Sequence, residues 1–198
     1  MKKVNLSGVP ETMLIALQAR AQYSRSHPHV LADPQAVEMV ARLDYDFSVA
    51  QSDAMASSGV AARTLLFDDL VRDFLARHPG STVVNLACGL DTRFHRVDDG
   101  QVRWYNLDLP EVIALRDQLV DPVDRVYNVA ASALDPAWPE QVEVTGEVLV
   151  VVEGLTMYFT ADEVRAMMGI IHDAFTGATT FVEVMAPLFR RFGRERSV

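Results

Sequence analysis

A turn of small residues and an acid further along the chain are the residues best suited to hold a ligand. Ala87 and Gly89 lie in a turn that follows the apolar run at 81–86. Side chains this small let backbone N–H groups approach a ligand closely. Asp108 ends the next apolar run, about 20 residues beyond the turn, where nucleotide sites carry an acid that binds ribose hydroxyls. The pairing indicates a nucleoside-type cofactor.

The turn lacks the third glycine of a dinucleotide fingerprint. Thr92 stands at that position, where glycine would allow the helix to pack closely on the strand. The turn alone therefore leaves two interpretations open, a nucleotide site and a tight strand-to-helix connection. The missing glycine weighs against a nicotinamide or flavin cofactor.

Two other charged residues fall at apolar positions. Glu153 closes the apolar run at 148–152, where an unpaired carboxylate would be costly and would tend to be protonated. Arg63 lies four residues before Phe67, on the apolar side of an expected helix, so its guanidinium needs a partner. Glu153 and Asp108 each have a second interpretation, because Glu153 could hydrogen-bond a loop and Asp108 could cap a helix.

The elements that would position these residues change in type near Gly80. Before it, apolar residues at helical spacing predict a helix around 13–21, a second one with Asp33 as its N-cap and Pro34 in its first turn, and a third over about 60–78. We expect the third helix to bury a stripe made of Leu66, Phe67, Leu70, Val71, Phe74 and Leu75.

Beyond Gly80, short apolar runs alternate with helical patterns. We expect strands at about 81–87, 102–108, 125–130, 147–153 and 179–185, and helices at 110–120 and 161–175. The capping-box sequence at 160–163 predicts where the last of these helices begins. This order predicts an α/β fold with a mostly parallel sheet that is covered on both faces. Ligands bind beyond the carboxyl ends of such strands, where the turn, Asp108 and Glu153 all fall.

Composition and charge indicate a globular domain that does not bind nucleic acid. The 198 residues are 49% hydrophobic, which is enough for one substantial core. Lys and Arg number 18 and Asp and Glu 27, so the net charge of −9 repels nucleic acid. The basic run at 190–196 is expected to be a solvated tail. We expect no nucleic-acid partner.

Cysteine usage and hydropathy favour the cytoplasm. Cys88 is the single cysteine, so we expect no internal disulfide, no metal site and a reducing compartment. No apolar run approaches the ~20 residues of a membrane span, and the first residues do not form a signal peptide. We expect a cytoplasmic protein without a membrane partner, and the sequence leaves the oligomeric state open.

Three blocks in this order resemble the leucine carboxyl methyltransferase family, especially its bacterial polyketide-type O-methyltransferases. They are VVNLACGLDTR at 83–93, NLDLP at 106–110 and VEGLTMYFT at 152–160. The resemblance extends over about residues 10–185. It implies an S-adenosylmethionine-dependent methyltransferase, with a helical N-terminal lid over residues 1–80 and a Rossmann-like core over residues 81–198.

The resemblance also implies roles for particular residues. Gly89 would lie under the cofactor, Asp108 would bind the ribose, Ser132 would flank the adenine, and Glu153 would lie near the methionine amino group. The full set of implied cofactor-binding residues is Arg20, Arg63, Ala87, Gly89, Asp108, Ser132 and Glu153.

Catalysis is assigned by the resemblance to Arg63 and Tyr158. Arg63 would meet a carboxylate, either that of the cofactor's methionine or that of a substrate. We expect a small-molecule or peptide acceptor that offers a carboxylate or a hydroxyl. A carboxylate acceptor needs only a cation to hold it, from Arg63 or Arg20, whereas a hydroxyl favours a general base. The candidate bases by residue type are His27, His29, His95 and His172.

Two departures from the family leave alternatives open. Ala87 replaces the commoner first glycine, and the chain ends several tens of residues earlier than members of the family usually do. The chain is thus either a natural short form or a fragment. The alternatives are a non-catalytic methyltransferase-like binding protein and an NAD(P)-dependent oxidoreductase, and the missing glycine and the absence of a Tyr-x-x-x-Lys arrangement oppose the latter.

Overall fold

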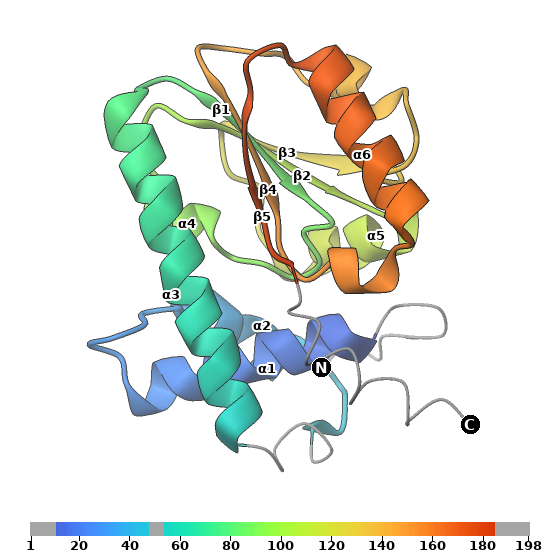
Figure 1. Cartoon of the computed structure of the whole chain (residues 1–198). Coiled ribbons are helices and arrows are strands. Elements are labelled where there is room, and N and C mark those ends of the chain that lie inside the picture. Colours follow the sequence, from blue (N-terminus) through green and yellow to red (C-terminus); the bar gives the residue numbers. More distant parts are fainter. Residues whose placement is uncertain (1–10, 48–53, 185–198) are drawn as a thin grey trace.

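Five parallel strands run through the middle of the structure, a computed structural model that describes residues 11–47 and 54–184 (Figure 1). The strands are β1 (Thr82–Leu86), β2 (Arg103–Asp108), β3 (Val126–Ala130), β4 (Val148–Val152) and β5 (Thr179–Val182). Each coincides with a predicted strand to within about two residues, except that β5 ends at Val182. The α/β fold class with a parallel sheet is confirmed.

The strand order β3-β2-β1-β4-β5 reverses the direction of the chain at β1. From β1 the chain proceeds outward through β2 to β3, and then returns to the other side of β1 to form β4 and β5. Leu86 pairs with Leu107 on β2 and with Val152 on β4, so the carboxyl ends of these three strands are level. A crevice beyond such a switch point is the ligand site of open parallel sheets.

Helices join the strands and cover them. They are α1 (Glu11–Ser26), α2 (Pro34–Arg42), α3 (Ala54–Arg77), α4 (Phe94–Val97), α5 (Pro110–Leu119) and α6 (Ala161–Ala174), with short 3-10 turns η2 (Trp138–Gln141) and η3 (Thr156–Tyr158). Asp33 caps α2 as predicted, through its side chain and the N–H of Ala36. Thr160 and Glu163 form a capping box at the start of α6, which fixes where this helix begins.

The unbroken apolar run of β4 is explained by burial on both faces of the sheet. Val150 packs in one cluster with Met167 and Ile171 of α6. Leu149 and Val151 pack in a second cluster on the opposite face, with side chains of α3 and α4. A strand that faces a core on both sides cannot alternate polar and apolar residues.

The structure corrects the predicted stripe of α3 at Leu66 and in part at Leu70, which is only half-buried. The helix begins at Ala54, about six residues before the predicted start. Phe67, Val71, Phe74 and Leu75 are buried against the sheet, as predicted. Leu66, however, is 59% exposed, because consecutive helical residues lie about 100° apart and Phe67 already occupies the buried face.

Helices α1 and α2 pack at the carboxyl end of the sheet, below it in Figure 1. Leu14 and Leu17 of α1 share a cluster with Leu115 and Leu119 of α5 and with Leu90 in the turn after β1. The division of the chain at residue 80 stays a prediction. In the structure, the last part of α3 shares a core with the strands that follow it.

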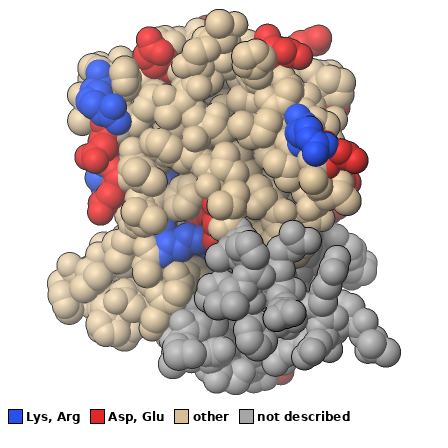
Figure 2. All heavy atoms as spheres, viewed as in Figure 1, with Lys and Arg blue, Asp and Glu red and all other residues tan. Residues whose placement is uncertain are grey.

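Figure 2 shows few charged side chains on the face around β5, and those of both signs stand mostly at its margins. In the described ranges, no helix is long and apolar enough to cross a membrane. Within the same ranges, no group of three His, Cys, Asp or Glu side chains is arranged to hold a metal ion. The basic run at 190–196 and the end of the predicted strand at 185 lie outside the described residues.

Candidate functional site

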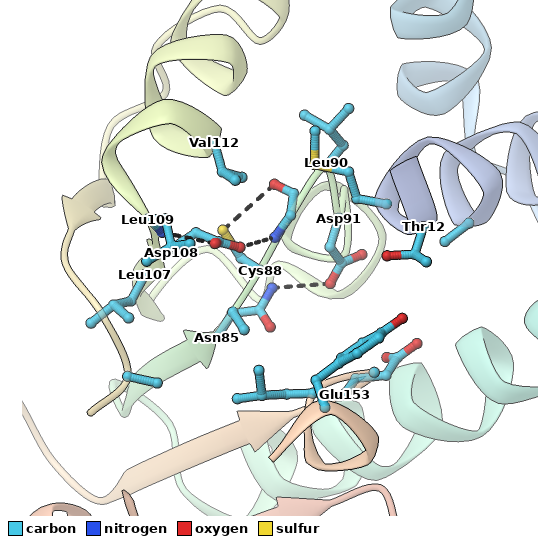
Figure 3. A pocket seen from close by; sticks show the side chains of 18 of the residues that line it. Thr12, Asn85, Cys88, Leu90, Asp91, Leu107, Asp108, Leu109, Val112 and Glu153 are labelled. Atoms are coloured by element: carbon cyan, nitrogen blue, oxygen red, sulfur yellow. Dashed lines mark hydrogen bonds between the residues drawn. The ribbon is translucent and has the colours of Figure 1, made fainter. Parts of the chain in front are cut away.

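A cavity of about 540 Å³ opens beyond the carboxyl ends of β1, β2 and β4. Its floor includes the turn after β1, and Asp108 and Glu153 stand at the ends of the two neighbouring strands. Thr12 and Arg20 of α1 line it from the N-terminal side. Figure 3 shows how Asp91, Asp108 and Glu153 surround the hollow. Its volume lies in the range of small-molecule and cofactor pockets.

The turn after β1 adopts a conformation that favours glycine. Gly89 has a φ of +50°, and a Cβ atom added there would lie 3.3 Å from Cβ of Met13 on α1. Glycine therefore allows both the backbone turn and the close approach of α1. Ala87 also has a positive φ, of 55°, which costs a residue with a side chain about 1–2 kcal/mol.

Asp108 connects β2 to this turn. One of its carboxylate oxygens accepts a hydrogen bond from the N–H of Gly89 at 2.7 Å, and the other accepts one from the N–H of Leu109 at 2.7 Å. Burial raises the pKa of Asp108, although these two N–H groups oppose the shift. The carboxylate supports the turn and lines the cavity at once. Its role in holding a ribose stays a prediction.

Arg63 and Glu153 meet at the wall of the cavity. Nε of Arg63 donates to Oε1 of Glu153 at 2.7 Å, and Nη1 donates to Oε1 of Glu183 at 3.2 Å. Glu183 also accepts from the N–H of Gly154 at 2.7 Å. Burial alone would lower the pKa of Arg63, but the two glutamates raise it. The opposite charge expected for Arg63 thus comes from Glu153 and Glu183 of the protein itself. Contact between Arg63 and a ligand carboxylate stays a prediction.

Arg20 reaches the cavity from α1 and is buried. Its Nη2 donates to the carbonyl oxygen of Leu90 at 2.7 Å, and its Nε lies 3.4 Å from Oδ2 of Asp33. Burial lowers the pKa of Arg20, against the effect of Asp91 and Asp33. The helix thereby places one cation beside the turn after β1.

The remaining predicted residues also line the same cavity. Ser132 follows β3, and its Oγ accepts from the N–H of Leu134 at 3.2 Å. Tyr158 lies in η3 at the rim and is 62% exposed. The structure therefore brings every predicted site residue to one cavity, while the individual roles stay predictions.

Two polar residues in the cavity were missed by the sequence analysis. Asn85 interrupts the apolar strand β1, and its amide donates to Oδ2 of Asp91 at 3.0 Å (Figure 3). Asp91 stands two residues after Gly89 and lines the cavity. The sequence offered a signal for each of them: Asn85 is an amide within an otherwise apolar strand, and Asp91 is an acid directly beside the turn.

A buried network of charged side chains behind the cavity was also missed. Arg93 donates to Asp68, and Arg96 donates to both Asp68 and Asp33. All four of these side chains are nearly inaccessible to solvent. Two features of the sequence could have indicated this network. Arg93 and Arg96 lie three residues apart just after the turn, and Asp68 follows Phe67 on the buried face of α3.

Much of the lining of the cavity is apolar. Its lining includes Ile15, Val60, Leu155, Met157 and Phe159. None of the described residues that line it is a histidine, so the four histidines considered as bases lie elsewhere in the fold. The site thus combines charged and apolar side chains in one cavity.

The model of the family described as Leucine carboxyl methyltransferase matches residues 12–172. The chain is 38% identical over 193 residues to the tetracenomycin polyketide synthesis O-methyltransferase TcmP of Streptomyces glaucescens, covering 96% of this chain and 71% of that protein. It is 38% identical over 189 residues to the S-adenosyl-L-methionine-dependent methyltransferase dpfgK of Gibberella zeae, covering 87% of this chain and 63% of that protein.

Among solved structures, an O-methyltransferase family protein from Burkholderia thailandensis is similar, with a TM-score of 0.47 and 20% identity over 83% of this chain and 51% of that one. The chain spans only part of each of these three proteins, namely 71%, 63% and 51% of their lengths, respectively. The family model nevertheless extends from α1, across the turn and the three acids of the cavity, into α6. The chain belongs to the leucine carboxyl methyltransferase family.

Proposed function

We propose that this protein is an S-adenosylmethionine-dependent O-methyltransferase that acts on a small molecule. The observation that carries the proposal is that one cavity, at the switch point of the sheet, holds both the glycine turn and the acids expected for the cofactor. The TcmP relative is a polyketide O-methyltransferase by name, and we extend a polyketide-type acceptor to this chain on that basis.

The residues of the inner cavity fit the cofactor chemically. Asp108 would hold the ribose hydroxyls, and Glu153 would face the ammonium group of the methionine part. Arg20 would hold the methionine carboxylate, because its Nη1 has no hydrogen-bond partner in the described part of the chain. Ser132 and Val112 would border the adenine. The bound cofactor supplies a methyl group on a sulfonium, which is transferred by in-line displacement.

The protein's own contribution is alignment and exclusion of water. α1 closes the cavity from one side through Thr12, Ile15 and Arg20. The apolar part of the lining, with Met157 and Phe159, would orient a flat or apolar acceptor. Because no histidine lines the described cavity, we favour an acceptor that is already ionised, such as a carboxylate or an acidic phenol.

Two of the assignments depend on this acceptor. Arg63 would stabilise an acceptor carboxylate if its contact with Glu183, the longer of its two ion pairs, gives way. Tyr158, exposed at the rim, would contact the acceptor. We also propose action in the cytoplasm, because the thiol of Cys88 is unpaired and buried.

A thermal-shift measurement with S-adenosylhomocysteine tests cofactor binding. At a hundredfold excess over its dissociation constant, a ligand specific for the native state adds about 2.7 kcal/mol to the free energy of unfolding. We expect a rise in melting temperature with S-adenosylhomocysteine and none with NAD or NADP. A folded sample that responds to neither, or only to a nicotinamide cofactor, would overturn the proposal.

Transfer is tested with methyl-labelled cofactor and candidate polyketide acids and phenols. A labelled product that loses its label in mild alkali is a methyl ester and identifies a carboxylate acceptor. Label that survives alkali identifies an ether and therefore a hydroxyl acceptor. Binding of the cofactor without any transfer would support the non-catalytic alternative.

A further inference from the structure

One buried arginine holds two carboxylates of the cavity. Arg93 follows the turn after β1, and its side chain is 1% exposed. Nη1 donates to Oδ2 of Asp91 at 2.8 Å, and Nη2 donates to Oε2 of Glu153 at 2.6 Å. Asp91 and Glu153 line the cavity, whereas Arg93 does not. The guanidinium therefore lies behind the two acids and not among the groups that a ligand would touch.

A third carboxylate anchors Arg93 to the helical layer. Its Nε donates to Oδ1 of Asp68 on α3 at 2.8 Å. The guanidinium carbon also lies 5.5 Å from the centre of the Phe67 ring, within the range of a cation–π contact. The plane of Arg93 is thus fixed by groups from three elements: the turn, the end of β4 and α3.

This arrangement determines the charge that the cavity presents. Two carboxylates at one small cavity repel each other, and in a buried site one of them would tend to take up a proton. Burial does act to raise the pKa of Asp91, but Arg93, Arg96 and Arg20 together hold it below its usual range. Asp91 and Glu153 remain 13% and 14% exposed, respectively. Both carboxylates therefore pair with Arg93 from behind and still open onto the cavity.

We propose that Arg93 is a positioning residue that fixes Asp91 and Glu153 as a pair of carboxylates for the ammonium group of the cofactor's methionine part. It acts without contacting the ligand. This role needs the planar guanidinium group of arginine, because a lysine ammonium cannot donate in one plane to three carboxylates at these positions. This inference rests on the proposed function, because it assumes that the cavity binds S-adenosylmethionine.

Two ligands separate this role from a general structural one. S-Adenosylhomocysteine carries the amino-acid part, and 5′-methylthioadenosine carries the same nucleoside and sulfur without it. By isothermal titration calorimetry, we expect Arg93→Lys to bind S-adenosylhomocysteine at least 10-fold more weakly and 5′-methylthioadenosine as the parent does. Arg125→Lys is the matched control, because Arg125 forms a two-point contact with Asp98 away from the cavity; both affinities should stay unchanged.

A double-mutant cycle tests whether Arg93 acts through Glu153. We expect Glu153→Gln to weaken S-adenosylhomocysteine selectively, and Arg93→Lys to add little in that background, because coupled residues give non-additive losses. Losses that simply multiply would overturn the inference. If Arg93→Lys does not fold by circular dichroism, Asp68→Asn tests the same anchor, since Asp68 contacts neither cavity acid, and it should give the same selective loss.

The outcomes distinguish this inference from the function on which it rests. If the parent protein binds both ligands and Arg93→Lys weakens both equally, or neither, the positioning role is overturned and the proposed function stands. If the folded parent binds neither ligand, both are overturned.

Discussion

Replacement of Asp33 by asparagine separates the charge of this residue from its shape. Oδ1 of Asp33 accepts from the N–H of Ala36 at 3.0 Å and so caps α2. The same carboxylate accepts from Oγ1 of Thr92 and, at 2.9 Å, from Nη1 of Arg96. Asp33 therefore joins the N-terminal helices to the segment after the cofactor turn. An asparagine can still cap the helix, but it cannot neutralise Arg96.

The burial of this pair sets the size of the effect. Asp33 is 1% exposed and the side chain of Arg96 4%, and removal of one partner of a buried ion pair costs about 3–5 kcal/mol. Arg96 retains Asp68, so we expect the lower end, about 3 kcal/mol, for Asp33→Asn. Asp33→Ala also loses the cap, which adds about 1 kcal/mol.

Urea unfolding followed by circular dichroism measures these losses. Such a loss is a large part of a typical total stability of about 5–15 kcal/mol, so both variants should unfold at clearly lower urea concentrations. Asp162→Asn is the control, because Asp162 pairs with Arg165 on the exposed surface of α6, and it should leave the midpoint unchanged. A loss below about 1 kcal/mol for Asp33→Asn would refute the reasoning.

Four other predictions follow from the same geometry. Gly89→Ala should lower the urea midpoint and weaken S-adenosylhomocysteine binding, because of its positive φ and the contact with Met13; an unchanged midpoint would contradict this. Asp108→Ala should remove most of the thermal shift caused by S-adenosylhomocysteine, since this carboxylate supports the turn and faces the cavity; a full shift in the variant would count against it. Burial raises the pKa of Cys88, so iodoacetamide should label the thiol in urea but not in the native protein at neutral pH, as mass spectrometry can show; rapid native labelling would disprove its burial. Because the pKa of Asp91 is lower in the folded than in the unfolded state, its contribution to stability is complete above about pH 5 and is lost as the pH falls below about 4; Asp91→Asn should flatten this acid limb in urea titrations, and an unaltered limb would argue against the shift.

The sequence determined those features that depend on neighbouring residues. The alternation of apolar runs and helical patterns located the five strands of the described residues, because the periodicity of a strand or a helix is a local property. Asp33-Pro34 and the capping box at Thr160 marked two helix starts for the same reason. The glycine turn and Asp108 were found from their residue types and spacing. They lie at one site because a parallel sheet brings the carboxyl ends of neighbouring strands to the same edge.

Only the tertiary structure decided which charges pair. Arg63 contacts Glu153 and Glu183, which are 90 and 120 residues away in sequence. Arg93 contacts Asp68 on a helix that precedes the sheet. Periodicity predicts that Arg63 faces inward, but not which carboxylate meets it, because that depends on strand order and on how α3 lies across the sheet.

Exposure at the single-residue level also required the fold. Leu66 was predicted to be buried and is exposed, since the direction of the apolar face of α3 is set by what it packs against. Asp33 was predicted to be a cap and also proved to anchor Arg96. A buried charge is tolerated only where distant groups supply opposite charge and hydrogen bonds, and those groups are brought together by packing, which no local pattern of residues specifies.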